Sequence, residues 1–137
     1  MKQQLHHLAL AAILATGAAF AHAADIKVSL NGAEETVPVT TSATGTGVIS
    51  IGADKRVTGS IATKDIEGTA AHIHNAPAGK NGPPVITLVK SADGVWSVPA
   101  GAALTDEQYA SYQAGNLYVN VHSAANKPGE IRGQLRP

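Results

Sequence analysis

Short runs of β-forming residues, each closed by turn-forming residues, are the feature that most restricts the fold of this chain. Within the runs, apolar and polar residues alternate, which is typical of half-buried strands. Gly, Pro, Asn and Asp separate the runs, for example at Asn31-Gly32 and across 52–55 and 91–94. Two hairpins are expected, around the second and third of these turns. The predicted strands are 26–30, 44–51, 56–63, 71–74, 85–89, 95–98, 117–122 and 130–135.

One segment departs from this alternation and begins like a helix. Thr105 can cap the helix, two acidic residues follow in its first turn, and Gln108 completes a capping box. Gly115 stands where a helix of two to three turns would end. We therefore predict an all-β fold, an antiparallel two-sheet sandwich of Greek-key type, with one short helix over 105–114.

The N-terminal segment 1–23 has the pattern of a signal peptide. After an initial lysine, residues 8–20 form an apolar run too short to span a bilayer, and Ala-His-Ala at 21–23 matches a cleavage site. Cleavage after this motif would leave one domain over 24–137. A cut two residues earlier also fits the pattern and would expose His22 at the new N-terminus. We expect an exported protein, either periplasmic or secreted.

Three histidines are the candidates for a functional site. Of the six histidines in the chain, only His72, His74 and His122 lie outside the predicted signal peptide. Alternate side chains of a strand share a face, so His72 and His74 project from one side, and His122 projects away from the apolar residues of 117–121. Imidazole is a leading ligand for Cu(II) and Zn(II), and the chain has no cysteine. We predict that the three histidines bind one ion, copper or alternatively zinc.

The same histidines also fit a structural role, in which the imidazoles bond to loop backbone and hold the rim of the fold. Four further residues could contact the histidines or have only a structural role. Glu130 and Arg132 share a face of the last strand; an exposed ion pair is the favoured interpretation, and support of the imidazoles is the other. Tyr118 has the parity of His122 and is expected near the site. Asn120, on the same side, would bond to the site or cover the surface.

Composition and motifs exclude several classes of function. The ten Lys and Arg balance the ten Asp and Glu, and no basic stripe is present, so nucleic-acid binding is not expected. No second apolar segment follows 8–20, so no membrane insertion is expected. The chain has no Gly-x-Ser-x-Gly motif and no cysteine nucleophile. Without a metal, the sequence does not predict an enzyme, and it identifies no protein partner.

Six segments carry ordered motifs: 30–39, 45–47, 72–85, 104–108, 115–123 and 128–135. Together they resemble the CHRD domain family, and the resemblance covers nearly all of 26–135. This family is named after chordin and is widespread in exported bacterial proteins. The resemblance implies an immunoglobulin-like β-sandwich and no particular biochemical activity. It identifies 24–137 as a single CHRD domain.

A fainter similarity is to copper,zinc superoxide dismutase, which places a His-x-His pair on one strand and another copper-ligand histidine near the chain end. The chain lacks the further histidines of the bridging and zinc positions and has no cysteine pair. Three functions therefore remain open. They are a copper-binding protein for metal binding or handling, a non-catalytic extracellular interaction module with structural histidines, and, least favoured, a dismutase-like redox enzyme.

Overall fold

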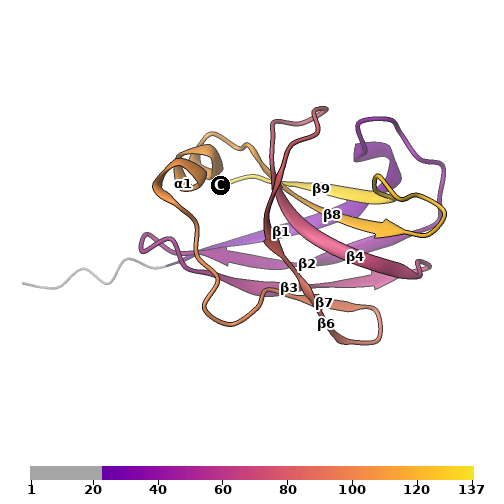
Figure 1. The fold of residues 1–137 in the computed structure, drawn as a ribbon, viewed down its shortest axis with the longest axis horizontal. Helices are drawn as coiled ribbons and strands as arrows, with labels where there is room; N and C mark the ends of the chain where they lie inside the picture. Colours follow the sequence, from indigo (N-terminus) through magenta and orange to yellow (C-terminus); the bar gives the residue numbers. More distant parts are fainter. Residues whose placement is uncertain (1–22) are drawn as a thin grey trace, which may run out of the picture.

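The computed structural model describes residues 23–137, which form nine β-strands, one α-helix and one short 3-10 turn (Figure 1). The predicted signal peptide lies outside the described residues, apart from Ala23. The helix α1 spans Asp106–Gln113, and the 3-10 turn spans Gly32–Glu34. The strands are β1 Ala24–Asn31, β2 Thr44–Ile51, β3 Val57–Lys64, β4 Gly68–Asn75, β5 Pro84–Thr87, β6 Val89–Ala92, β7 Val95–Ser97, β8 Leu117–Ser123 and β9 Ile131–Leu135.

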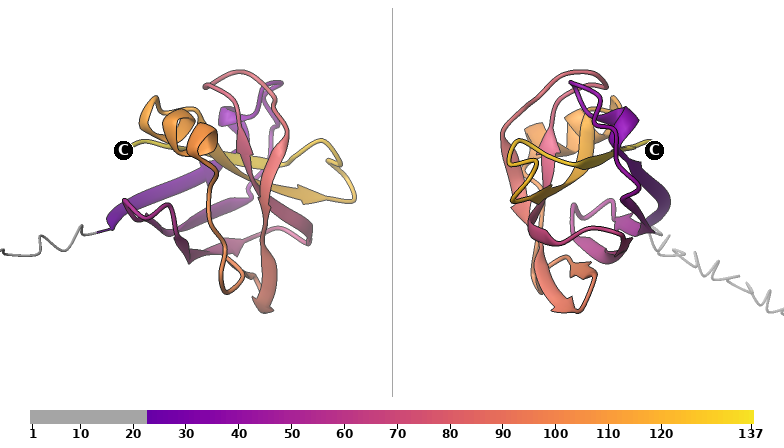
Figure 2. Two further views of the ribbon diagram at one scale, coloured as in Figure 1. Left: turned by 60° about the vertical axis from the view of Figure 1, so that its left-hand side comes forward. Right: turned by 90° about the vertical axis from the view of Figure 1, so that its right-hand side faces the viewer.

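The strands form one antiparallel sheet in the order β5-β4-β8-β9-β1-β2-β3-β7-β6. The sheet bends between β9 and β1, which share a single paired position, Asn31 with Arg132. Its two end strands, β5 and β6, are joined through Leu88, so the sheet curls until it nearly closes (Figure 2). The prediction of an all-β fold with one short helix is confirmed. The two-sheet, Greek-key, immunoglobulin-like detail is not, because a single strand order runs through the molecule.

Apolar side chains from alternate strand positions fill one core between the facing parts of this sheet. On β1 the buried residues are Ile26, Val28 and Leu30, as the alternation in 26–30 predicts. The apolar residues of β8 also point inward, with no exposed surface at Leu117 or Val119. The opposite side of β4, β8 and β9 carries the polar residues of these strands. We call this side the polar face.

The first predicted hairpin is confirmed, and the second is partly wrong. β2 pairs with β3 over their full length. The predicted strand 85–89, however, is divided between β5, which pairs with β4, and β6, which pairs with β7. The N–H of Leu88 donates to Ala71 O on β4 at 2.9 Å, and the chain then crosses to β7. The segment predicted as one strand therefore contributes to both ends of the curled sheet.

The helix begins and ends where its end signals predict. Thr105 Oγ1 accepts from the N–H of Gln108, and Gln108 Oε1 accepts from the N–H of Thr105, which completes the capping box. Tyr112 is buried against the core, and Tyr109 packs beside it, so the two tyrosines attach the helix to the sheet.

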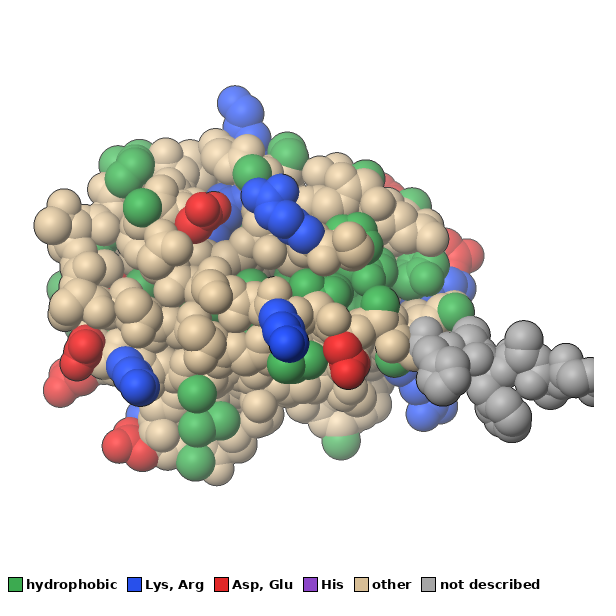
Figure 3. Space-filling model, turned by 180° about the vertical axis from the view of Figure 1, so that it is seen from behind, with side chains coloured by type: hydrophobic (Ala, Val, Ile, Leu, Met, Phe, Trp, Pro, Cys, Tyr) green, Lys and Arg blue, Asp and Glu red, His purple; other side chains and the backbone are tan. Residues whose placement is uncertain are grey.

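On the face seen in Figure 3, basic and acidic side chains are interspersed and no histidine is visible. Within residues 23–137, no helix has both the length and the apolar content needed to cross a membrane.

Candidate metal centre

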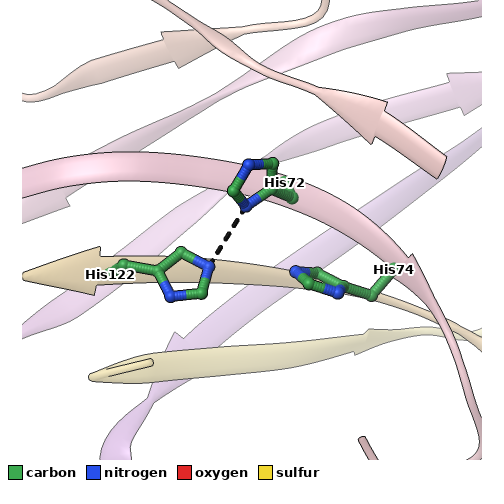
Figure 4. Close-up of side chains that lie close together, drawn as sticks. All are labelled: His72, His74 and His122. Carbon is green, nitrogen blue, oxygen red and sulfur yellow. Dashed lines mark hydrogen bonds between the residues drawn. The ribbon is translucent and has the colours of Figure 1, made fainter. Parts of the chain in front are cut away.

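The structure brings His72, His74 and His122 together on the polar face. His72 and His74 lie on β4 and His122 on the adjacent β8, where His122 pairs with Ala70 and is therefore diagonal to His72. The ring centroids are 5.1–6.0 Å apart. One ring nitrogen from each residue lies within 4.8 Å of the others, and Figure 4 shows the rings pointing toward one another. The predicted convergence is confirmed.

Two backbone carbonyls determine which ring nitrogen of His74 and of His122 faces the cluster. Nδ1 of His74 lies 2.9 Å from Gly82 O, and Nδ1 of His122 lies 2.8 Å from Lys127 O. A carbonyl oxygen can only accept, so both Nδ1 atoms carry the proton and donate it. The Nε2 atoms of His74 and His122 are then unprotonated in the neutral rings. A hydrogen bond from Nδ1 to a carbonyl is the usual support for a metal-binding histidine.

The two Nε2 atoms differ in their partners. Nε2 of His122 is 3.1 Å from Nδ1 of His72, which donates to it in the neutral state (Figure 4). Nε2 of His74 is buried and has no hydrogen-bond partner among the described residues. A buried polar atom without a partner costs about 1–3 kcal/mol. An ion bonded to this atom would remove that cost, so the donor set fits a transition metal that prefers imidazole.

The surroundings of His72 and His74 favour the neutral form of these two imidazoles. Burial lowers the pKa of His74, and the neighbouring imidazoles and Arg132 lower it further, against the opposing effect of the Gly82 hydrogen bond. The pKa of His72 is also lowered, first by burial and then by His122. Neutral imidazole is the form that binds a metal, so the site favours that form at neutral pH.

Tyr118 supports His74 from the next strand, where sequence parity placed it. The two rings are stacked, with centroids 4.9 Å apart and planes 8° from parallel. The Tyr118 hydroxyl accepts a hydrogen bond from the N–H of Gly82 at 3.2 Å. Tyr118 therefore contacts both His74 and the residue whose carbonyl holds the His74 ring.

The favoured interpretation of Glu130 and Arg132 as an exposed ion pair is wrong, because both side chains are buried and neither bonds to the other. Glu130 accepts from Ser123 at 2.5 Å and from Thr41 at 2.6 Å. The Ser123 bond is the largest of the effects that lower the pKa of Glu130, against the opposing effect of burial. Arg132 is only 1% exposed. Chain segments near residues 36 and 80 pack over this part of the polar face. The alternation of residues along β9 cannot predict that distant segments bury its outward side chains.

Asn120 also differs from both of its predicted roles, since it neither bonds to the histidines nor covers the surface. It is 2% exposed and donates from Nδ2 to Glu35 Oε1 at 2.5 Å. Burial raises the pKa of Glu35 to about 7, against the opposing effects of the Asn120 bond and of Arg132. No sequence pattern points to Glu35, Gly82 or Lys127. Gly82 and Lys127 act through their backbone carbonyls, and Glu35 is remote in sequence from the strand residue that it contacts.

We expect Gly82→Ala to weaken metal binding, because the segment bearing this carbonyl has no room for a side chain. A Cβ at Gly82 would lie 1.9 Å from the carbonyl oxygen of Asn75. The backbone must therefore shift, and the bond from His74 Nδ1 to Gly82 O shifts with it. A loss of roughly tenfold or more in copper affinity is expected, as for other changes around metal-binding histidines. Competition against a chelator of known affinity measures it.

The matched control is Gly79→Asn in the same segment. An added Cβ at Gly79 meets nothing within 4 Å, and asparagine tolerates the φ of +75° found there. Copper affinity should stay unchanged in this variant. Equal affinities of the Gly82→Ala and wild-type proteins would show that the carbonyl of Gly82 does not hold the ligand.

Comparison with known proteins adds one finding. A family model described as the CHRD domain matches residues 26–135. No curated protein and no solved structure matches the chain.

Proposed function

Since the chain belongs to the CHRD domain family, we propose that this CHRD domain binds one transition-metal ion, preferably Cu(II), through His72, His74 and His122. The observation that carries the proposal is the buried Nε2 of His74. It is unprotonated in the neutral ring, has no partner among the described residues, and lies in a group of three ring nitrogens within 4.8 Å of one another. A purely structural role for the three histidines does not explain why Nε2 of His74 is buried without a partner.

Copper is preferred to zinc on chemical grounds. An all-imidazole site suits both ions, and at a given nitrogen site Cu(II) binds more strongly than the other divalent first-row metals. Three histidines leave a coordination position for water or another ligand. The role would be metal binding or handling in the periplasm or outside the cell, in line with the signal peptide that we propose for 1–23.

The wild-type protein should bind one equivalent of Cu(II) at this centre, measured by calorimetric titration against a weak competing chelator, with Zn(II) titrated in parallel. The N-terminus must be read by intact mass, because a form that starts at His22 could bind a second Cu(II) through its free amine and imidazole. A form that starts at Ala24 and binds neither ion would contradict the proposal.

The titration should also depend on pH in one direction. Protons compete with the metal for the same nitrogens, and the ordinary histidine pKa is about 6.5. Affinity should therefore fall as the pH drops through about 6.5. Because the pKa values of His72 and His74 are lowered, the competition of protons for these two ligands should extend to lower pH.

The competing function is a non-catalytic interaction module with structural histidines. The His72–His122 hydrogen bond and the two carbonyl contacts favour it, since these bonds need no ion. Metal stoichiometry separates the two functions. A dismutase-like enzyme is less well supported, because Arg132 is buried and engaged by four acceptors, so it is not free to steer an anion.

A further inference from the structure

Arg132 is a buried cation that forms no ion pair with any carboxylate of residues 23–137. Its side chain is among the largest with less than 2% exposure, and it takes part in none of the ion pairs found in residues 23–137. Burying a charge is costly unless hydrogen bonds compensate it. Here the acceptors are all neutral: Thr36 Oγ1 at 3.2 Å, Lys80 O at 2.7 Å, Pro77 O at 3.0 Å and Gln134 Oε1 at 3.0 Å.

Two of these acceptors belong to the segment that holds His74. Pro77 and Lys80 lie in the connection between β4 and β5, and the same connection contains Gly82, whose carbonyl accepts from His74 Nδ1. By bonding to both carbonyls, Arg132 ties this segment to β9. The position of Gly82 O, and with it the tautomer of His74, therefore depends on a residue of the neighbouring part of the sheet.

The guanidinium also contacts the ring that supports His74. Its central carbon lies 3.5 Å from the centroid of the Tyr118 ring. Because β8 lies between β4 and β9 in the sheet, Arg132 and His74 approach Tyr118 from opposite sides. The Tyr118 ring is thereby held between a planar cation and a planar imidazole, an arrangement suited to the flat guanidinium of arginine.

We propose that Arg132 is a positioning residue of the metal centre, which fixes the His74 imidazole through Tyr118 and through the segment that carries Gly82. This inference rests on the proposed metal-binding function. The positioning role explains why this buried position holds an arginine and not an apolar residue. Only a planar group with several donors can stack on the Tyr118 ring and also donate to the carbonyls of Pro77 and Lys80. Arg132 makes no contact with the ion and acts only through its neighbours.

Arg132→Lys is the informative variant, because lysine keeps the positive charge but cannot reproduce the stacked, multiply bonded geometry. We expect roughly a tenfold or greater loss of Cu(II) affinity, the range found for residues that orient metal ligands. The electron paramagnetic resonance spectrum of the copper-saturated protein should also change, because the orientation of one imidazole changes. A purely structural arginine would alter the unfolding temperature and leave the spectrum of the folded, loaded protein unchanged.

Arg56→Lys is the matched control, because Arg56 is an exposed arginine next to β3 and belongs to none of the strands β4, β8 and β9. It should retain the wild-type affinity and spectrum. If Arg132→Lys does not fold, Tyr118→Leu tests the same link by removing the ring between Arg132 and His74, with the same expected changes.

These experiments distinguish failure of the Arg132 positioning role from failure of the metal-binding proposal. A wild-type protein that binds no copper overturns both. A wild-type protein that binds one copper, together with an Arg132→Lys or Tyr118→Leu variant of equal affinity and identical spectrum, overturns the inference alone.

Discussion

The His74→Ala protein should lose stoichiometric copper binding, with a fall in affinity of at least about 100-fold, the upper end of what changes to outer-shell partners cause. His74 contributes the one nitrogen of the three that is buried and has no other partner in the described chain. Alanine removes that donor and leaves His72 and His122 free to bond to each other at 3.1 Å, as they do in the structure. Two imidazoles already engaged in this way form a poor site. Calorimetry or chelator competition measures the loss.

Thr58→Ala serves as the control for this result. Thr58 is exposed on β3 and belongs to neither β4 nor β8, so its variant should bind like the wild type. The His74→Ala protein must first be shown to be folded, because it also loses the Gly82 hydrogen bond and the Tyr118 stack. A folded His74→Ala protein that still binds one equivalent of Cu(II) with unchanged affinity would defeat the metal-binding proposal.

Metal should raise the thermal stability of the wild-type domain by roughly 10 °C. A ligand that binds only the folded state at 100 times its dissociation constant stabilises it by about 2.7 kcal/mol, and each kcal/mol shifts the unfolding temperature of a domain of this size by roughly 4 °C or more. The ion would connect β4 to β8 and, through their carbonyl bonds, the turns that bear Gly82 and Lys127. Thermal unfolding followed by circular dichroism, with and without Cu(II) or Zn(II), measures the shift.

A chelator should return the loaded protein to its original unfolding temperature, and the His74→Ala protein should show almost no shift at the same metal concentration. An equal shift in both proteins would mean that the metal binds elsewhere, for example at a free His22 amine. Absence of any shift in a wild-type protein shown to bind metal would mean that the ion also binds the unfolded chain.

Much of the architecture and the histidine cluster could be predicted because they depend on local periodicity. Alternation in 26–30 predicts which side of β1 is buried, and the capping box at Thr105 predicts where α1 begins. The i, i+2 spacing of His72 and His74 places both rings on one face of any strand. Once 117–122 is predicted as a strand with an apolar inner side, His122 must project outward. These properties follow from residues that are near one another along the chain.

The hydrogen-bond partners of the side chains on the polar face depend on the tertiary structure alone. Arg132 and Asn120 alternate like exposed strand residues, yet they are buried because segments distant in sequence cross over them, bringing Thr36 and Glu35 into hydrogen-bonding distance. The run 85–89 had the pattern of one strand, but the curl of the sheet divides it between β5 and β6. Whether an outward side chain meets water or protein depends on which distant segments pack over it, and alternation along one strand carries no information about that packing.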